Sequence, residues 1–277
     1  MGGAGPRRGR VAVVTAYDGL ASAWSSGAIH VYGPLARALV AAAPDPLDGR
    51  LVLDAGSGTG AVAEAAAAGG ARVVTADLTV GMIAYQRGQH RPGAVADVFG
   101  LPFAGGAFDG ALAGFVLNHL APAPALAELA RVVGPGGAVL ASTWSGGRPD
   151  PVKEAIDAVI ASRGWVPPAW YQVMKNEVEP ISGSPGALAA AAESVGLTEV
   201  VATVSRVDLG LRDTRSVVDY RLAMPHIAPW VATLDGPARV GLIRSALAAV
   251  AGEVTPLEPW RPEVIFLACR VDPHPNR

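Results

Sequence analysis

Short apolar runs alternate with amphipathic segments through the middle of the chain, a pattern typical of a parallel sheet wrapped by helices. The apolar runs predict buried strands at 51–54, 72–76, 93–97, 108–115 and 138–143. The segments between them repeat with a helical period and predict helices at 59–68, 80–88 and 123–132. This alternation predicts an α/β fold with a doubly wound, mostly parallel sheet and helices on both faces.

The regular alternation of predicted strands and helices stops on both sides of this core. Residues 1–10 are rich in Gly, Pro and Arg and predict a disordered tail, and the pattern from Thr15 to Ala43 is helical. Beyond Trp144, apolar runs at 198–208 and 263–271 predict two strands that return to the sheet and bring it to seven. A helix at 185–195 is expected to return to the sheet with the strand 198–208, and long excursions predict cap helices at 150–163, 168–178, 213–224 and 236–251.

These patterns divide the chain into three parts. We expect a tail and N-terminal lid helices in 1–48, a ligand-binding core in 49–145, and cap helices plus the terminal strands in 146–277. Open α/β sheets bind their ligands at the carboxyl ends of the strands. The extra helices at both ends therefore predict a lid over that edge.

The junction between the first strand and the first core helix is the most informative stretch. Its apolar run ends at Asp54 and opens into Gly56, Gly58 and Gly60. Glycine tolerates the tight backbone angles of such a turn, and a Cβ at Gly56 or Gly58 would collide with a ligand lying on it. The loop predicts a nucleotide-sized ligand.

The loop alone is compatible with two kinds of nucleotide ligand. Gly56, Gly58 and Ala61 also satisfy the dinucleotide pattern, with Asp77 about 20 residues further on, where a ribose-binding acid belongs. An NAD-linked oxidoreductase is therefore an alternative. Asp54 argues against it, because a carboxylate beside the turn would repel a pyrophosphate but suits an ammonium group.

Asp97 supplies a third acid after the next βα unit. Its carboxylate can accept from the exocyclic amine of adenine while the next backbone N–H donates to the ring. S-adenosylmethionine (SAM) offers an amino acid head, a ribose diol, an adenine and a sulfonium cation, without a phosphate. The three acids match these parts one by one, so we expect SAM as the cofactor and 49–145 as the SAM-binding core.

The chain resembles the class I SAM-dependent methyltransferases of the UbiE-like and small-molecule natural-product branch. The resemblance rests on six motifs in the order and at the separations of that family. They are Val52-Leu-Asp-Ala-Gly-Ser-Gly-Thr-Gly60, Ala76-Asp-Leu-Thr-Val-Gly-Met82, Ala96-Asp-Val-Phe-Gly-Leu-Pro-Phe103, Ala107-Phe-Asp-Gly110, Val116-Leu-Asn-His-Leu120 and Glu128-Leu-Ala-Arg-Val-Val-Gly-Pro-Gly-Gly137.

The resemblance implies a role for each acid: Asp54 at the methionine end, Asp77 on the ribose hydroxyls and Asp97 on the adenine edge. The full set of cofactor-binding residues implied is Asp54, Ala55, Gly56, Ser57, Gly58, Asp77, Leu78, Met82, Asp97, Val98, Phe115 and Tyr17. Phe99 and Gly100 depart from the polar residues that many relatives have there.

Displacement at a sulfonium requires alignment, exclusion of water and, for some acceptors, removal of a proton. His119 is the first general-base candidate because it follows the fourth strand at the carboxyl edge, and His226 and His30 are the others. Each has a structural alternative, and a nucleophilic carbon or a phenolate needs no base. The five histidines lack partners at metal-ligand spacing, so we expect no metal.

Aromatic residues outside the nucleotide unit indicate the methyl acceptor, because apolar ligand pockets are lined in this way. The candidates for substrate contact are Trp24, Tyr32, Trp144, Trp170, Tyr171, Tyr220 and Trp230. The alternative is that they form the core of small lid helices.

Composition narrows the partners. With 277 residues, 17% charged, and a net charge of −2, neither nucleic acid nor an acidic membrane surface is expected. No apolar run approaches the roughly 18 residues of a membrane span. The single cysteine, Cys269, excludes an internal disulfide and favours the cytoplasm. An apolar lid also suits a homodimer interface, and the oligomeric state stays open.

The sequence thus predicts a SAM-dependent methyltransferase acting on an apolar small molecule, aromatic or polyketide- or alkaloid-like, in secondary metabolism. A protein of this fold that keeps SAM but transfers no methyl group, such as a cyclase or a binding module, stays an alternative, because a fold alone does not decide activity.

Overall fold

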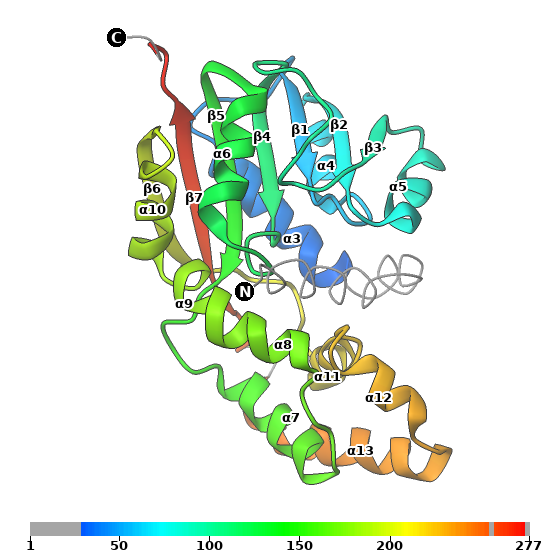
Figure 1. The fold of residues 1–277 in the computed structure, drawn as a ribbon. Helices are drawn as coiled ribbons and strands as arrows, with labels where there is room; N and C mark the ends of the chain where they lie inside the picture. The colour runs from blue at the N-terminus through cyan, green and yellow to red at the C-terminus, as the bar shows by residue number, and fades with distance from the viewer. Residues whose placement is uncertain (1–28, 255–257, 275–277) are drawn as a thin grey trace, which may run out of the picture.

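One mixed sheet organises the computed structural model, which describes residues 29–254 and 258–274 (Figure 1). Its strands are β1 (Leu51–Ala55), β2 (Arg72–Asp77), β3 (Gly93–Val95), β4 (Phe108–Gly114), β5 (Val133–Trp144), β6 (Leu197–Arg206) and β7 (Glu263–Val271). They are ordered β3-β2-β1-β4-β5-β7-β6. β7 runs antiparallel to both neighbours and the other pairs are parallel, which confirms the predicted seven-stranded, mostly parallel sheet.

Helices cover both faces of the sheet, as the alternating pattern predicted. On one face α3 (Ile29–Ala41) packs against α4 (Ala61–Ala68). On the other, α6 (Pro122–Val132) packs against α10 (Pro185–Glu193). α5 (Val80–Arg87) flanks β2 and β3 at one end of the sheet (Figure 1).

The two faces bury separate apolar clusters. In β1, Val52 belongs to the cluster beneath α3 and α4, and the next residue, Leu53, belongs to the cluster beneath α6 and α10. Both side chains are fully buried. Consecutive side chains of a strand point to opposite faces, so a sheet covered on both sides needs the unbroken apolar runs seen in this sequence.

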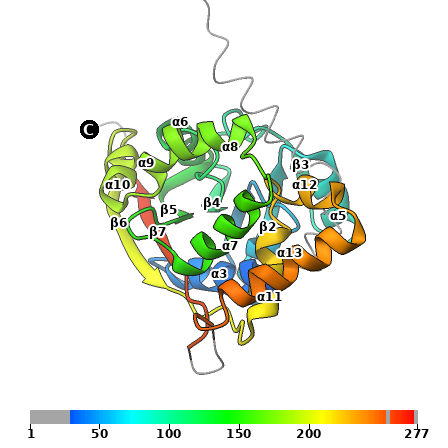
Figure 2. The ribbon, with the colours of Figure 1, turned by 90° about the horizontal axis from the view of Figure 1, so that it is seen from below.

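Both C-terminal excursions are helical. The first holds α7 (Pro151–Ser162), α8 (Ala169–Val173), the π-helical η2 (Met174–Val178) and α9 (Glu179–Ser182), and the second holds α11 (Thr214–Leu222), α12 (Ala228–Thr233) and α13 (Gly236–Ala249). Figure 2 shows α7, α8, α11 and α13 in front of the sheet when the molecule is seen from below. The predicted lid over the carboxyl edge is therefore present.

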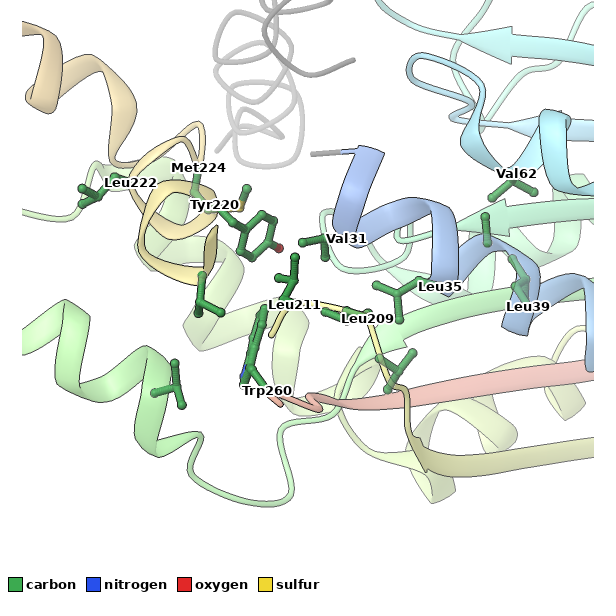
Figure 3. Close-up of a cluster of buried hydrophobic side chains, with 14 of the residues drawn as sticks. Val31, Leu35, Leu39, Val62, Leu209, Leu211, Tyr220, Leu222, Met224 and Trp260 are labelled. Carbon is green, nitrogen blue, oxygen red and sulfur yellow. The ribbon is translucent and has the colours of Figure 1, made fainter. Parts of the chain in front are cut away.

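The lid is attached to the core by apolar packing (Figure 3). Tyr220 of α11 and Trp260, which precedes β7, lie with ring centroids 5.7 Å apart. Leu209, Leu211 and Val31 of α3 belong to the same buried cluster, and Figure 3 shows Val31 beside the Tyr220 ring. The second excursion is thus tied to the first described helix of the chain.

Two local differences from the sequence pattern have simple causes. α12 was not predicted, because its six residues are too few to show a helical period. β5 starts at Val133 rather than 138, because the strand includes Gly134-Pro-Gly-Gly137. Its pairing with β4 is irregular between Phe108 and Gly110, which accommodates these extra residues. Within the described residues, no helix is both long and apolar enough to cross a membrane.

Candidate cofactor and acceptor site

A cavity of about 840 Å³ lies between the carboxyl ends of the strands and the lid helices. Asp54, Asp77 and Asp97 line it beside the glycine loop, and lid aromatics line it elsewhere. Pockets for single organic ligands span roughly 300–1,000 Å³. The volume therefore suits a nucleotide-sized ligand together with a small second molecule.

The acids come together because each lies at, or just beyond, the carboxyl end of a parallel strand. Asp54 is opposite Thr75 of β2 and Leu112 of β4, Asp77 is the last residue of β2, and Asp97 comes two residues after β3. Carboxyl ends of parallel strands meet at one edge, so three positions far apart in sequence line one space.

The glycine loop has the left-handed backbone that the sequence predicted, with φ of 65° at Gly56 and 52° at Gly58. At Gly56, however, an added Cβ would lie 2.3 Å from Val116 Cγ2. A side chain of the protein therefore already requires glycine here, and the collision with a ligand stays a prediction. At Gly58 an added Cβ meets nothing within 4 Å.

Asp77 ties the end of β2 to this loop. Its Oδ2 accepts from Gly58 N and its Oδ1 from Thr79 N, both at 2.8 Å. Burial raises the pKa of Asp77 above its ordinary value, although these two N–H groups oppose the shift. A carboxylate has about four lone-pair sites, so Asp77 can still accept a hydrogen bond from a ligand hydroxyl group.

Asp54 is fully buried, and its Oδ2 accepts from Ala63 N of α4 at 2.9 Å. Its Oδ1 has no hydrogen-bond partner among the described residues. Burial raises the pKa of Asp54 to about 7, the Ala63 N–H lowers it, and the charge of Asp77 raises it further. A buried carboxylate oxygen without a donor fits a ligand that brings an ammonium group.

Beyond β3, Asp97 Oδ1 accepts from Phe99 N at 3.0 Å. Val98, Leu78 and Met82 line the cavity beside it, with Met82 buried and Leu78 39% exposed. An acid flanked by apolar side chains is the surrounding that an adenine edge and its ring faces require.

These observations fit SAM. The orphan oxygen of Asp54 would receive the ammonium group, Asp77 the ribose hydroxyls, and Asp97 the adenine. The open space above Gly58 leaves room for the ligand to lie against the loop.

Aromatic side chains line a second part of the cavity, which we call the acceptor end; they are Tyr32, Phe115, Trp144 and Tyr220. Tyr32 of α3 makes edge contacts with Phe115, Trp144 and Tyr220, at centroid separations of 5.3, 6.2 and 6.3 Å. Phe115 follows β4 with φ of 58° and lies 4.6 Å from the Trp144 ring. The strand end, the first helix and the lid thus share one aromatic wall.

The candidate bases are placed differently from one another. His119 lines the cavity, and burial lowers its pKa to about 4. His226 also lines it, stacked on Tyr171 at 3.9 Å with 7° between the planes, and burial followed by the charge of Arg221 lowers its pKa to about 2. Both imidazoles are neutral at pH 7 and weakly basic. His30 is exposed on the first turn of α3 and is absent from the described lining of the cavity.

Some of the other predicted site residues line the cavity, and others do not. Ser57, Trp170, Tyr171 and Tyr220 line the cavity. Trp230 of α12, by contrast, packs against the apolar cluster that also lies beneath α3 and α4, and it is not part of the described lining. The side chain of Ala55 is buried in the cluster beneath α6.

Tyr17 and Trp24 lie outside the described residues. Among those that are described, no three His, Cys, Asp or Glu side chains gather as a metal site would need.

Three polar residues at the site were missed by sequence reasoning. Gln86 is fully buried on α5, where its Nε2 donates to Ser57 Oγ and to Gly58 O, both at 2.7 Å. Lys153 and Arg221 line the acceptor end. A polar residue on the buried face of a helix was an available signal for Gln86, but nothing local marked the other two.

Comparison with known proteins agrees with this geometry. Residues 53–141 match the family model of a methyltransferase domain. Demethylmenaquinone methyltransferase of Corynebacterium kroppenstedtii is 37% identical over 102 residues, which are 36% of this chain and 44% of that protein. The chain thus spans less than half the length of this relative.

Two solved structures share the fold at low identity. Phosphoethanolamine N-methyltransferase 2 of Haemonchus contortus, in complex with S-adenosylhomocysteine, is 17% identical with a TM-score of 0.50, over 86% of this chain and 52% of that one. The cyclase SpnF is 20% identical with a TM-score of 0.50, over 87% and 80%. Residues 53–141 are thus similar to a methyltransferase domain, and the fold is that of the class I SAM-dependent methyltransferases.

Proposed function

We propose that this protein transfers a methyl group from SAM to an apolar, aromatic or polyketide- or alkaloid-like small molecule. The single observation that carries the proposal is one cavity with both halves of such a reaction. Asp54, Asp77 and Asp97 lie in its nucleotide half, and Tyr32 and Trp144 in its acceptor half.

In the nucleotide half, bound SAM would supply an electrophilic methyl group on a sulfonium. The chain's own task is to hold that group in line with the acceptor, which lowers the barrier by fixing orientation. Asp77 is held by two backbone N–H groups, and Asp54 by one. Carboxylates fixed in this way bind without reorganising when the ligand arrives.

In the acceptor half, the aromatic wall and the lid exclude water from the reaction. Tyr32, Phe115 and Trp144 lie edge to face or tilted, which leaves flat ring surfaces and edges for a planar apolar molecule. The low pKa values of His119 and His226 make them poor proton acceptors but suitable hydrogen-bond acceptors for an acceptor hydroxyl.

The finer parts of the proposal are a role in natural product biosynthesis, a cytoplasmic location and a homodimer. The apolar acceptor half supports the first, and the buried free thiol of Cys269 supports the second. Exposed apolar side chains such as Val240 on α13 support the third. Size-exclusion chromatography with light scattering tests the oligomer.

Calorimetric titration with SAM tests the cofactor half. We expect binding by the wild type, at least about tenfold weaker binding by Asp77→Ala, and unchanged binding by Glu64→Ala, an exposed acid on nearby α4. Failure of the wild type to bind SAM at micromolar protein, with Asp77→Ala no different, would end the proposal.

Formation of S-adenosylhomocysteine, followed by mass spectrometry over a panel of aromatic acceptors, tests the transfer. Release of S-adenosylhomocysteine with a methylated product supports it. Product without S-adenosylhomocysteine would instead identify a cyclase-like protein that keeps SAM as a scaffold. A nicotinamide absorbance change with NADH would indicate the oxidoreductase alternative.

A further inference from the structure

Lys153 brings an ammonium group into the acceptor half of the cavity. The residue lies in the first turn of α7 and lines the cavity, with its side chain 27% exposed. Its Nζ lies 4.5 Å from the ring centroid of Trp144 and 5.9 Å from that of Trp260. Trp144 in turn contacts Phe115 at the end of β4. The cation therefore lies inside the aromatic wall where the acceptor binds.

The charge of Lys153 is weakly compensated. In the described part of the chain its only ion pair joins Nζ to Asp150 Oδ2 across 3.8 Å, beyond hydrogen-bond distance. That carboxylate is committed elsewhere, because its Oδ2 accepts from Trp260 Nε1 at 3.0 Å and its Oδ1 from the backbone N of Lys153 at 3.1 Å.

The neighbouring cations are paired more closely. Arg221 makes two hydrogen bonds to Asp157, and Lys175 forms a close ion pair with Glu179. These side chains also line the cavity. Arg148 also lines the cavity but is exposed, so Lys153 is the partly buried lining cation on this side without a close counter-ion among the described residues.

Burial lowers the pKa of Lys153 to about 8, while Asp150 and Asp157 raise it and Arg221 and Lys175 lower it. At pH 7 the group is still mainly an ammonium. A partly buried cation without a close counter-ion costs free energy, and an anionic oxygen from a ligand reduces that cost. Lysine acts as a point charge, which suits one oxygen rather than the paired oxygens that arginine binds side by side.

We propose that Lys153 binds an ionised oxygen of the methyl acceptor, and that the acceptors are aromatic phenols or enols bound as their anions. The inference rests on the proposed function but concerns only the acceptor half of the cavity. It narrows the acceptor from an apolar molecule to one with an acidic hydroxyl next to an aromatic or conjugated system.

The test uses 4-nitrophenol, whose anion absorbs visible light and whose neutral form does not, with its methyl ether, 4-nitroanisole, as the neutral control. Titrations of the full-length protein with saturating S-adenosylhomocysteine report which form of the probe is bound. We expect Lys153→Met to weaken binding of the anion about tenfold and to raise the apparent pKa of the bound probe. Binding of 4-nitroanisole is expected to stay within about twofold of the wild type.

Arg244→Met is the control, because Arg244 is an exposed cation on α13 of the same lid that is not in the described lining of the cavity. It is expected to leave the preference for the anion unchanged, and Lys153→Arg is expected to retain most of it. Three results would overturn the proposal. They are an unchanged anion preference in Lys153→Met, a loss of that preference in Arg244→Met as large as in Lys153→Met, and no binding of the anion by the wild type.

S-adenosylhomocysteine binding, measured by calorimetry on the same proteins, separates the two proposals. Loss of S-adenosylhomocysteine binding in the wild type counts against the proposed function. Normal S-adenosylhomocysteine binding without a preference for the anion counts against the role of Lys153 alone.

Discussion

Arg221 of α11 and Asp157 of α7 are joined by two hydrogen bonds, from Nε to Oδ1 at 2.8 Å and from Nη2 to Oδ2 at 2.6 Å. The arginine side chain is 8% exposed and the aspartate 35%. Burial lowers the pKa of Arg221, but the hydrogen bonds and charge of Asp157 outweigh this and raise it. One helix from each C-terminal excursion is thus fixed to the other at the roof of the cavity.

Removing the carboxylate should loosen the lid. In Asp157→Ala the guanidinium of Arg221 stays buried without its counter-ion, so we expect a loss of about 2–3 kcal/mol in the free energy of unfolding. This is below the ~3–5 kcal/mol of a fully buried pair, because Asp157 is partly in water. Urea unfolding at pH 7 measures the change.

Asp219→Ala is the control, because it breaks the exposed Arg215–Asp219 pair on the same helix, worth less than about 1 kcal/mol. The double variant Asp157→Ala with Arg221→Met should recover part of the loss, since no buried charge remains. Equal losses for the two aspartate variants would contradict this account of the pair.

Replacement of the two loop glycines by alanine should affect different properties, mainly stability at Gly56 and mainly ligand binding at Gly58. In Gly56→Ala the left-handed backbone costs about 1–2 kcal/mol and the contact with Val116 adds about 1–3 kcal/mol, so stability falls most. In Gly58→Ala only the backbone term applies, but the new methyl group occupies the space for the ligand. Thermal unfolding together with calorimetric titration with S-adenosylhomocysteine separates the two effects.

Val116→Ala provides the internal check. It removes the atoms that the new methyl group would meet, so Gly56→Ala with Val116→Ala should lose less than the sum of the two single changes. A strictly additive loss would show that the contact with Val116 does not determine the need for glycine.

The sheet and its acids were predictable because their signals are local. A buried strand such as β1 is an apolar run, and the acid that ends it needs no distant partner to be recognised. Once the alternation of strands and helices is read, topology alone brings Asp54, Asp77 and Asp97 to one edge.

The lid was not predictable in the same detail, because its contacts join distant segments. Arg221 is separated from Asp157 by 64 residues, and no periodicity shows that their helices meet. The type of a residue also does not determine where its side chain points: Tyr220 lines the cavity, whereas Trp230 of α12 packs against the apolar cluster. The role of Val116 at Gly56 is also invisible in sequence, since it depends on where the chain goes after β4.

Binding of SAM or S-adenosylhomocysteine should strengthen as pH rises from 6 to about 7.5. Burial raises the pKa of Asp54 to about 7, with Asp77 raising it further and Arg91 lowering it. The ligand's ammonium group requires the ionised carboxylate, so binding at pH 6 must displace a proton. The expected gain is about five- to tenfold, measured by calorimetry in buffers of different ionisation enthalpy to count the protons.

The unliganded protein should show the opposite trend in stability from this group. A folded-state pKa above the unfolded value means that folding binds a proton, so the contribution is fully present at low pH and is lost as pH rises through 7. Asp54→Asn keeps an oxygen for Ala63 N but carries no charge. It should therefore be more stable than the wild type at pH 8, by roughly 1–4 kcal/mol, with weaker and pH-independent ligand binding. A variant less stable than the wild type at pH 8 would show that the buried charge is not the cost assigned to it.

Gln86 should control cofactor affinity without touching the cofactor. Its Nε2 fixes Ser57 Oγ and Gly58 O at 2.7 Å each, in a fully buried position. Gln86→Leu fills the same volume but removes both hydrogen bonds and leaves the Gly58 carbonyl without this donor. We expect S-adenosylhomocysteine affinity to fall about tenfold, because the loop must then be ordered by the ligand itself.

Gln89→Leu is the matched control, an exposed glutamine one turn further along the chain whose Oε1 accepts from Arg91. Its affinity for S-adenosylhomocysteine should stay within about twofold of the wild type, because exposed polar contacts contribute little. Hydrogen exchange of the amides from 56 to 60 provides the second measurement. Faster exchange in the unliganded Gln86→Leu protein, suppressed by the ligand, is expected if the glutamine pre-orders the loop, and unchanged exchange with unchanged affinity would assign it to core packing alone.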